Sequence, residues 1–154
     1  MQTELYSIKK AELPDKMLWL KMRSILWPDA NLAEHEKEID HILQDDSNFV
    51  AFLAINHEEN PVAFAEVSMR SYANGCESKP VAFLEGIWVA EPYRQQGIAK
   101  KLIDAAADWS RSKSCYELGS DTELHNQVSF DAHLKWGFKE TERVIYFRKL
   151  LHSD

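Results

Sequence analysis

The sequence predicts a single α/β domain in which a mixed, twisted sheet is flanked by helices. Three observations lead to this fold class. The chain has 154 residues, 45% of them apolar, which suits one domain with a proper core. Strand-like runs and stretches of helical periodicity follow one another along it. No repeat, low-complexity stretch or linker interrupts residues 1–154, so we expect no second domain.

The first half of the chain predicts two helices and three strands. Pro14 lies in the first turn of a helix that stops at Trp27, because the residue before Pro28 avoids helical backbone. The second helix is heavily acidic, and a polar turn at His57–Asn60 joins the last two strands. In order, the elements are the short edge strand Tyr6–Ile8, the helices Leu13–Trp27 and Leu32–Gln44, and the strands Phe49–Ile55 and Val62–Arg70.

The second half is organised around Leu84–Leu102. The strand Phe83–Val89 is apolar except at Glu85 and Gly86, and a helix opens at Gly97 after a proline turn. The later elements are the strand Tyr116–Ser120, the helix Gln127–Trp136 ended by Gly137, and the strands Phe138–Thr141 and Arg143–Leu150. We therefore expect about six or seven strands and about four helices.

Bulk composition narrows the function classes. The net charge is −7, from 18 basic and 25 acidic residues, which disfavours nucleic acid because its binding needs phosphate neutralisation. No apolar run approaches the roughly 20 residues of a membrane span, and the N-terminus lacks the plan of a signal peptide. Cys76 and Cys115 show no pairing pattern or metal spacing. We expect a cytoplasmic protein with no membrane or nucleic-acid partner, whose acidity would suit a cationic small substrate.

The loop Arg94–Ala99 is the first candidate site. Where a loop turns into a helix, several backbone N–H groups point to one place, and the helix dipole adds positive potential there. Gly97 lets an anion approach closely, and small Ala99 leaves the first turn uncrowded. The pattern predicts a pyrophosphate cradle, although an ordinary strand-to-helix connection shares it. P-loops and dinucleotide fingerprints are excluded, because their Gly-Lys-Ser/Thr and three spaced glycines are missing.

Strand, proline turn and cradle together resemble the acyl-CoA-binding motif of the GNAT acetyltransferase superfamily. Its pattern is Q/R-x-x-G-x-G/A, and Arg94, Gly97 and Ala99 fill the fixed places. The resemblance implies acetyl-CoA as the acetyl donor, and a sheet that splits after Phe83–Val89 so that the donor enters the split. In this superfamily that strand is bulged, with which Gly86 is consistent. Backbone N–H groups of Ile87–Val89 could then polarise the thioester carbonyl.

Two carboxylates are candidates for handling the acceptor amine. An amine with a lysine-like pKa of about 10.4 is almost wholly protonated at neutral pH, so a base must remove a proton. Glu85 is the leading base, directly or through water, because burial in an apolar strand would strengthen it; a Glu on the solvent face of the sheet is the alternative. Asp121 follows the fifth strand, where open α/β sheets present ligands, and is otherwise a helix cap or loop carboxylate.

The departing thiolate needs a proton donor. The superfamily uses the tyrosine of a Tyr-x-x-x-Gly-Phe pattern, but His133 stands in its place here. A histidine could protonate the thiolate or only hydrogen-bond the donor, and Tyr146 is a rival that could instead be packing. Asn126 matches an amide that contacts pantetheine in the superfamily, or is a plain helix cap. We predict no metal site, because His35 and His41 lack paired ligands and belong to a helix expected to be exposed.

Four further stretches resemble the aminoglycoside 6′-N-acetyltransferases, in a subgroup of short, dimeric chromosomal-type resistance enzymes: Leu26–Pro28, Tyr72–Cys76, Pro80–Ile87 and Glu140–Val144. The resemblance implies direct transfer to the 6′-amine in a ternary complex, and a homodimer that uses the C-terminal strand. It implies an aminoglycoside site lined by Trp27, Tyr72, Glu85, Asp121 and Glu142, an inventory that suits ammonium groups and sugar rings. It implies acetyl-CoA contacts from Ile87, Trp88, Val89, Arg94, Gln95, Gln96, Gly97, Ile98, Ala99, Lys100 and Asn126.

Two other functions are also compatible with the sequence. One is a GNAT enzyme for a different amine, such as a polyamine or a protein N-terminus, because the cradle fits both. The other is a non-catalytic acyl-CoA sensor, in which Glu85 and Asp121 would be structural. Turnover of an amine acceptor with acetyl-CoA would separate the enzymes from the sensor.

Overall fold

The computed structural model describes residues 5–152, which fall into two compact units that divide after Asp121. The first unit holds a five-stranded sheet in the order β1-β2-β3-β4-β5. Its strands are β1 (Tyr6–Lys10), β2 (Phe49–Asn56), β3 (Pro61–Arg70), β4 (Val81–Val89) and β5 (Leu118–Gly119). Its helices are α1 (Lys16–Leu26), α2 (Leu32–Gln44) and α3 (Ile98–Ser112), with short 3-10 turns at Leu13–Asp15 and Glu91–Tyr93. The second unit holds α4 (Gln127–Lys135).

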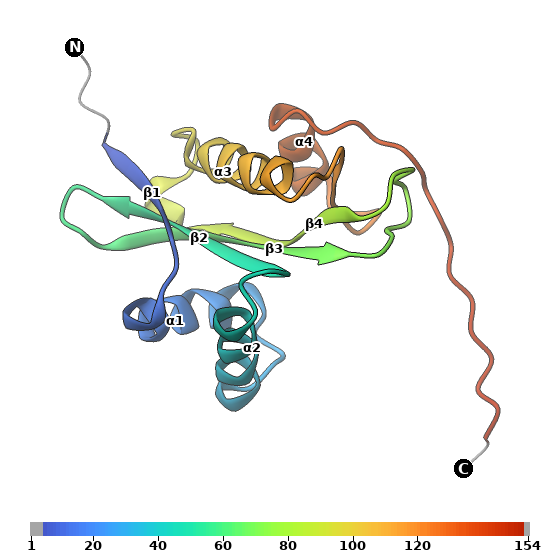
Figure 1. Ribbon diagram of the computed structural model, residues 1–154, viewed down its shortest axis with the longest axis horizontal. Helices are drawn as coiled ribbons and strands as arrows, with labels where there is room; N and C mark the ends of the chain where they lie inside the picture. The colour runs from blue at the N-terminus through green and yellow to red at the C-terminus, as the bar shows by residue number, and fades with distance from the viewer. Residues whose placement is uncertain (1–4, 153–154) are drawn as a thin grey trace. The chain divides into compact units, whose positions relative to one another are not determined.

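The sheet is mixed, as predicted. Strands β1 to β4 pair antiparallel in sequence order, and β5 pairs parallel to β4 after the crossover through α3. Helices α1 and α2 lie on one face of the sheet and α3 on the other (Figure 1). The predicted fold class is confirmed, with fewer strands in residues 5–152 than the six or seven expected.

Helices α1 and α3 each bury one face, whereas no residue of α4 is buried. Met17, Leu18 and Ile25, which supply apolar positions in the sequence of α1, are exposed. Helix α1 buries Trp19, Leu20 and Met22, which form a core with Ile39 of α2 and with Leu53 and Phe64 of the sheet. Helix α3 buries Ile98, Leu102, Ile103 and Ala106. Helix α2 begins at Leu32 because Asn31 and Glu34 form a reciprocal capping box at its start. Within residues 5–152, every helix is too short or too polar to cross a membrane.

Strand β4 contains the bulge that the sequence suggested. Glu66 of β3 faces Gly86, whereas the next residue, Val67, faces Leu84, so that Glu85 is an extra residue without a partner in the register. Beyond this point the sheet divides. The ladder between β4 and β5 has only the pairs Ala82 with Leu118 and Phe83 with Gly119, and it ends where the bulge begins. Strands β4 and β5 are therefore unpaired beyond Phe83, as the predicted split of the sheet after Phe83–Val89 requires.

The predicted strands Phe138–Thr141 and Arg143–Leu150 are wrong. Residues 138–150 form no strand, and large apolar side chains there are exposed, with Phe147 91% accessible. Their residue types favour strand, but a strand also requires a neighbour that accepts its backbone hydrogen bonds, and no such ladder forms within residues 5–152 of this chain. Local propensity alone therefore did not decide the structure of this segment.

Candidate active site

A cleft of about 920 Å³ lies beside the bulge, between the end of α1, the start of α2 and strands β3 and β4. Its wall includes Trp27, and its charge is dominated by carboxylates. The acidic residues that line it are Asp29, Glu34, Glu38, Glu66 and Glu85, against the basic residues Arg23 and Lys37. Of the predicted acceptor-binding residues, this cleft brings together Trp27 and Glu85. A cleft of this charge and size suits a cationic ligand with several ammonium groups.

The indole ring of Trp27 packs directly against the backbone of Gly86. A Cβ atom at Gly86 would lie 2.5 Å from Cη2 of Trp27 and closer still to Cζ2, so only glycine leaves room for the ring. Phe64 meets the indole edge-on at 6.0 Å between ring centroids, and the guanidinium carbon of Arg23 lies 4.7 Å from the ring centroid on its face. The aromatic wall of the cleft is thus fixed from three directions.

Glu85 lies on the bulge with its carboxylate held by two neighbours. Arg70 donates from Nε and Nη2 to Oε1 at 3.0 and 2.9 Å and from Nη2 to Oε2 at 2.9 Å, while the hydroxyl of Ser68 also donates to Oε1. Glu85 is exposed, with its side chain 34% accessible, so the burial expected of this carboxylate in an apolar strand is not found. The guanidinium of Arg70 in turn lies 3.7 Å over the ring of Phe83. The candidate base is therefore oriented by an ion pair that the sequence did not reveal.

A charged network of low exposure forms part of the cleft lining. Arg23, His35 and Glu66 are 2%, 1% and 5% exposed. Glu66 accepts hydrogen bonds from Trp19 Nε1 at 2.9 Å and from Arg23 Nη1, and Arg23 Nη2 also reaches Glu38. Desolvation raises the pKa of Glu66, against the opposing effect of the Arg23 charge. The expectation that His35 lies on an exposed helix face is wrong, because α2 turns this side chain into the core; His41 is exposed as expected.

The cradle has the geometry that an anion needs. Gly97 caps the N-terminus of α3 with φ of +80°, and a Cβ there would meet no atom within 4 Å. Gln95 also has a positive φ, of 62°. The first turn of α3 contains no acidic residue and includes Lys100. These residues leave an open, positively polarised site at the helix start, which fits a pyrophosphate.

Side chains of the cradle loop tie it to the sheet. Arg94 Nε donates to the carbonyl of Val89 at 2.8 Å, and Gln96 Nε2 donates to the carbonyl of Pro92 at 3.2 Å. The hydroxyl of Tyr6 in β1 donates to Gln96 Oε1. Arg94 therefore braces the turn between β4 and α3 with one of its N–H groups. Ile87, Trp88 and Val89 lie in the part of β4 beyond its ladder with β5, and Ile98 and Ala99 open α3.

The remaining predicted residues of the first unit are less constrained. Tyr72 follows β3 and is 62% exposed, and it does not line the cleft. Asp121 is exposed and lies just after β5. Asp121, like Tyr72, is not among the residues that line the cleft.

In the second unit, Asn126 caps α4 by accepting the N–H of Ser129 at 3.0 Å. Nδ1 of His133 lies 2.7 Å from the carbonyl oxygen of Ser129, and its ring meets those of Trp136 and Phe138. Glu142 and Tyr146 are exposed on the extended segment. Within this unit His133 is packed by aromatic rings, whereas Tyr146 is not buried.

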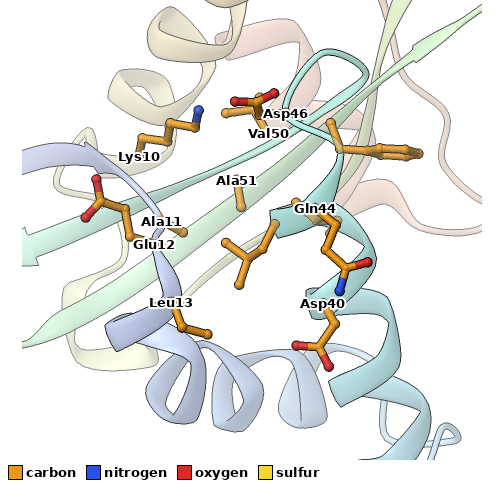
Figure 2. Close-up of a pocket in the computed structure, with 12 residues that line it drawn as sticks. Lys10, Ala11, Glu12, Leu13, Asp40, Gln44, Asp46, Val50 and Ala51 are labelled. Atoms are coloured by element: carbon orange, nitrogen blue, oxygen red, sulfur yellow. The ribbon is translucent and has the colours of Figure 1, made fainter.

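A smaller cavity of about 460 Å³ lies elsewhere in the first unit (Figure 2). Lys10 and Glu12 line it from the end of β1, and Asp40 and Gln44 line it from α2, over a floor that includes Ala51. None of the predicted site residues contributes to it. Within residues 5–152, no group of three or more His, Cys, Asp or Glu is arranged to hold a metal ion.

Comparison with known proteins decides the family. The model of the acetyltransferase (GNAT) family matches residues 19–138. The chain belongs to the GNAT acetyltransferase family. This GNAT chain is 46% identical over 134 residues to aminoglycoside N(6′)-acetyltransferase type 1 of Serratia marcescens, covering 86% of the chain and 91% of that protein. It is 45% identical over 136 residues to the Salmonella typhimurium protein of the same name, covering 85% and 90% respectively.

Solved structures agree with the sequence relatives. The structure of AAC(6′)-Iy in complex with the bisubstrate analogue CoA-S-monomethyl-acetylneamine is 40% identical, with a TM-score of 0.89 over 94% of this chain and 98% of that one. AAC(6′)-Ih from Acinetobacter baumannii is 36% identical, with a TM-score of 0.89 over 96% and 99% of the two chains. The resemblance to the GNAT acetyltransferases, and within them to the aminoglycoside 6′-N-acetyltransferases, is confirmed.

Proposed function

We propose that this chain transfers the acetyl group of acetyl-CoA to the 6′-amine of aminoglycosides, directly within a ternary complex, and thereby confers antibiotic resistance. One observation carries the proposal: the first unit joins an acidic, aromatic cleft to a bulged strand that runs into an anion cradle. The cleft offers an acceptor site and the cradle a donor site, and Glu85 lies on the bulge that separates them. The relatives described above are named as acetyltransferases of the same 6′-amine.

The donor's pyrophosphate would be held by the cradle. The open site at Gly97 leaves room for phosphate oxygens, and the first N–H groups of α3 would donate to them. Lys100 and the cradle side chains Gln95 and Gln96 would add charge and hydrogen bonds. The edge of β4 at Ile87–Val89, beyond the ladder with β5, would offer backbone groups to the pantetheine arm and the thioester carbonyl. Bound there, acetyl-CoA supplies the activated acyl group.

The acceptor would lie in the cleft, with a sugar ring against Trp27. Ammonium groups of the acceptor would be matched by Glu85 and by the carboxylates of the α2 side, which are spread around the cleft rather than paired at one point. The resemblance adds Tyr72, Asp121 and Glu142 to this site, and we keep these assignments as part of the proposal. A multiply charged acceptor is favoured over a monoamine by this distribution of carboxylates.

As the acceptor nitrogen bonds to the carbonyl carbon and the carbon–sulfur bond breaks, an ammonium proton must leave and the thiolate must gain one. Because Arg70 and Ser68 already occupy the carboxylate of Glu85, we propose that this residue accepts the proton through a water molecule. Asp121 would bind cationic acceptor. His133, with Tyr146 as the alternative, would return a proton to the thiolate.

Paired variants test these roles by a thiol-release assay with kanamycin-type, gentamicin-type and polyamine acceptors. Glu85→Gln keeps shape but loses the base, so kcat should fall by about 10²–10⁴-fold with its pH profile displaced upward. Asp121→Asn should instead raise the acceptor KM, more at low salt. Glu58→Gln, on an exposed hairpin turn, is the control. An unchanged kcat and pH profile for Glu85→Gln would remove Glu85 as the base.

The same assay tests the substrate class. Turnover of polyamines but of no aminoglycoside would redirect the proposal to another amine. Acetyl-CoA binding without turnover of any acceptor would indicate a sensor.

A homodimer through the C-terminal segment is the second part of the proposal. This segment has an exposed apolar run of strand-forming residue types, with Val144 53%, Ile145 78% and Phe147 91% exposed. Such a run promotes aggregation if no partner covers it. A second copy that pairs with this segment would cover it. A dimeric mass by light scattering at micromolar concentration, reduced to a monomer by Ile145→Lys, is the expected result. A monomeric wild type would contradict it.

We further propose that residues 1–154 make up one GNAT domain and that the protein is cytoplasmic. The family match supports the first point, because residues 19–138 run across both compact units. Absence of a pairing pattern between Cys76 and Cys115, which are both free thiols, supports a reducing compartment. Cell fractionation of the native host protein would test the location.

A further inference from the structure

The buried network that lines the cleft ends on the backbone of Trp27. Arg23 Nε donates to His35 Nδ1 at 3.3 Å, and His35 Nε2 lies 3.0 Å from the carbonyl oxygen of Trp27. A guanidinium Nε can only donate and a carbonyl oxygen can only accept. The imidazole that satisfies both contacts is therefore the neutral tautomer with its hydrogen on Nε2. A chain of hydrogen bonds thus runs from the carboxylate of Glu66 through Arg23 and His35 to the backbone carbonyl of Trp27.

That carbonyl lies where a helix end needs a partner. Trp27 follows the last residue of α1 with φ of −122° and ψ of 74°, so the chain leaves helical geometry at this residue. Its N–H still donates to the carbonyl of Arg23 at 2.8 Å. Carbonyl groups at a helix C-terminus have no partner within the helix, and here His35 of α2 supplies one. The direction in which residue 27 leaves α1 is therefore set by a side chain from another helix.

The ring of Trp27 is held by the same network. The guanidinium of Arg23 covers one face of the indole at 4.7 Å, and the ring rests on Gly86, next to the bulged Glu85. Backbone and ring are thus restrained together, by His35 and Arg23 respectively. A buried ion network need not stabilise the fold, because desolvation of the charges offsets much of their attraction. The consequence that we draw from this network is that it fixes the orientation of Trp27.

We propose that His35 and Arg23 are positioning residues for the acceptor site, which hold Trp27 in the orientation that forms the wall of the cleft. The inference rests on the proposed role of Trp27 in acceptor binding. Arg23 of α1 and His35 of α2 line the cleft on one face of the sheet, whereas α3, whose start forms the donor cradle, lies on the other face (Figure 1). Their loss should weaken acceptor binding and leave donor binding unchanged.

Two substitutions at residue 35 separate positioning from folding. Glutamine can place an amide N–H near the position of Nε2 and keep the bond to the Trp27 carbonyl, whereas asparagine is too short to reach it but can still accept from Arg23. We expect His35→Asn to raise the acceptor KM about tenfold with the acetyl-CoA KM unchanged, and His35→Gln to restore most of the acceptor affinity. Ile39→Ala, which opens a cavity in the core on the same helix, should lower thermal stability without this KM split.

A second variant covers the case in which His35→Asn does not fold. Arg23→Lys keeps a positive charge beside Glu66 but loses the Nε donor and the planar group over the indole, and the same split between the two KM values is expected. Trp27→Ala is the reference. If it raises the acceptor KM while His35→Asn and Arg23→Lys do not, or if the glutamine and asparagine variants behave alike, the positioning role is refuted. If Trp27→Ala itself leaves the acceptor KM unchanged, the proposed acceptor site fails, and the positioning role with it.

Discussion

Gly86→Ala should disturb the candidate site by moving one ring. A methyl group at residue 86 would lie 2.5 Å from Cη2 of Trp27, whereas ordinary contacts begin at 3.4 Å. The indole must therefore retreat by about 1 Å, against Arg23 and Phe64, or the strand must shift. Because interiors are close-packed, either movement costs about 1–3 kcal/mol of the free energy of unfolding.

Urea unfolding of four proteins measures this cost: wild type, Gly86→Ala, Trp27→Leu and the double variant. Leucine lacks the six-membered ring that meets the new methyl group. Gly86→Ala should therefore destabilise the wild type by about 1–3 kcal/mol but the Trp27→Leu protein by much less, a coupling of about 1 kcal/mol or more. The acceptor KM of Gly86→Ala should rise, because the displaced ring no longer forms the cleft wall. Additive free energies in the cycle would refute the contact as the cause.

Three further outcomes are expected. Gly97→Asp should weaken acetyl-CoA binding more than tenfold by calorimetry, since charge-assisted contacts are worth about 1.5–3 kcal/mol, whereas Gly97→Ala reports the backbone strain alone. Hydrogen bonds from the Ser78 hydroxyl and N–H lower the folded-state pKa of Glu117. Its stabilisation is therefore fully present above the unfolded pKa of about 4.3 and is lost as the pH falls through the lower folded-state pKa. Urea unfolding between pH 3 and 7 should show a steeper acid loss for wild type than for Glu117→Gln. Burial raises the pKa of the Cys115 thiol, so Ellman's reagent should label it far more slowly in the native protein than in urea.

The fold was predictable wherever local pattern and tertiary contacts agree. The acidic helix Leu32–Gln44 has the bounds predicted from the sequence, and α3 begins after Gly97 as predicted, at a glycine with positive φ. The segment Arg143–Leu150 has equally clear strand propensity, yet no ladder forms there. Periodicity reports which face of an element can be buried, but it cannot report whether a hydrogen-bonding neighbour exists.

The residues of the candidate site that belong to a recognisable sequence motif could be predicted, whereas those that act by packing against other residues could not. Trp27 and Glu85, named from the sequence, line one cleft. Arg23 and His35 were missed, since a charged side chain on a helix usually points to solvent. A signal was present, because Arg23 falls on the apolar face of α1 and Glu66 interrupts an apolar strand. Opposite charges at two such positions are typical of a buried pair, but only the structure shows them to meet.

The bulge at Glu85 gives the sheet an irregularity that a one-residue deletion would repair. Without Glu85, Leu84 and Gly86 would become consecutive and would face Val67 and Glu66, which are themselves consecutive, so the ladder would be regular along its whole length. Every other pair between β3 and β4 would be retained. Selection for a robust fold alone would therefore favour the shorter strand. The longer one places a carboxylate and a glycine next to each other beside one cleft, which a regular strand would turn to opposite faces. In this part of the chain, the geometry of the candidate site and the regularity of the sheet are in conflict.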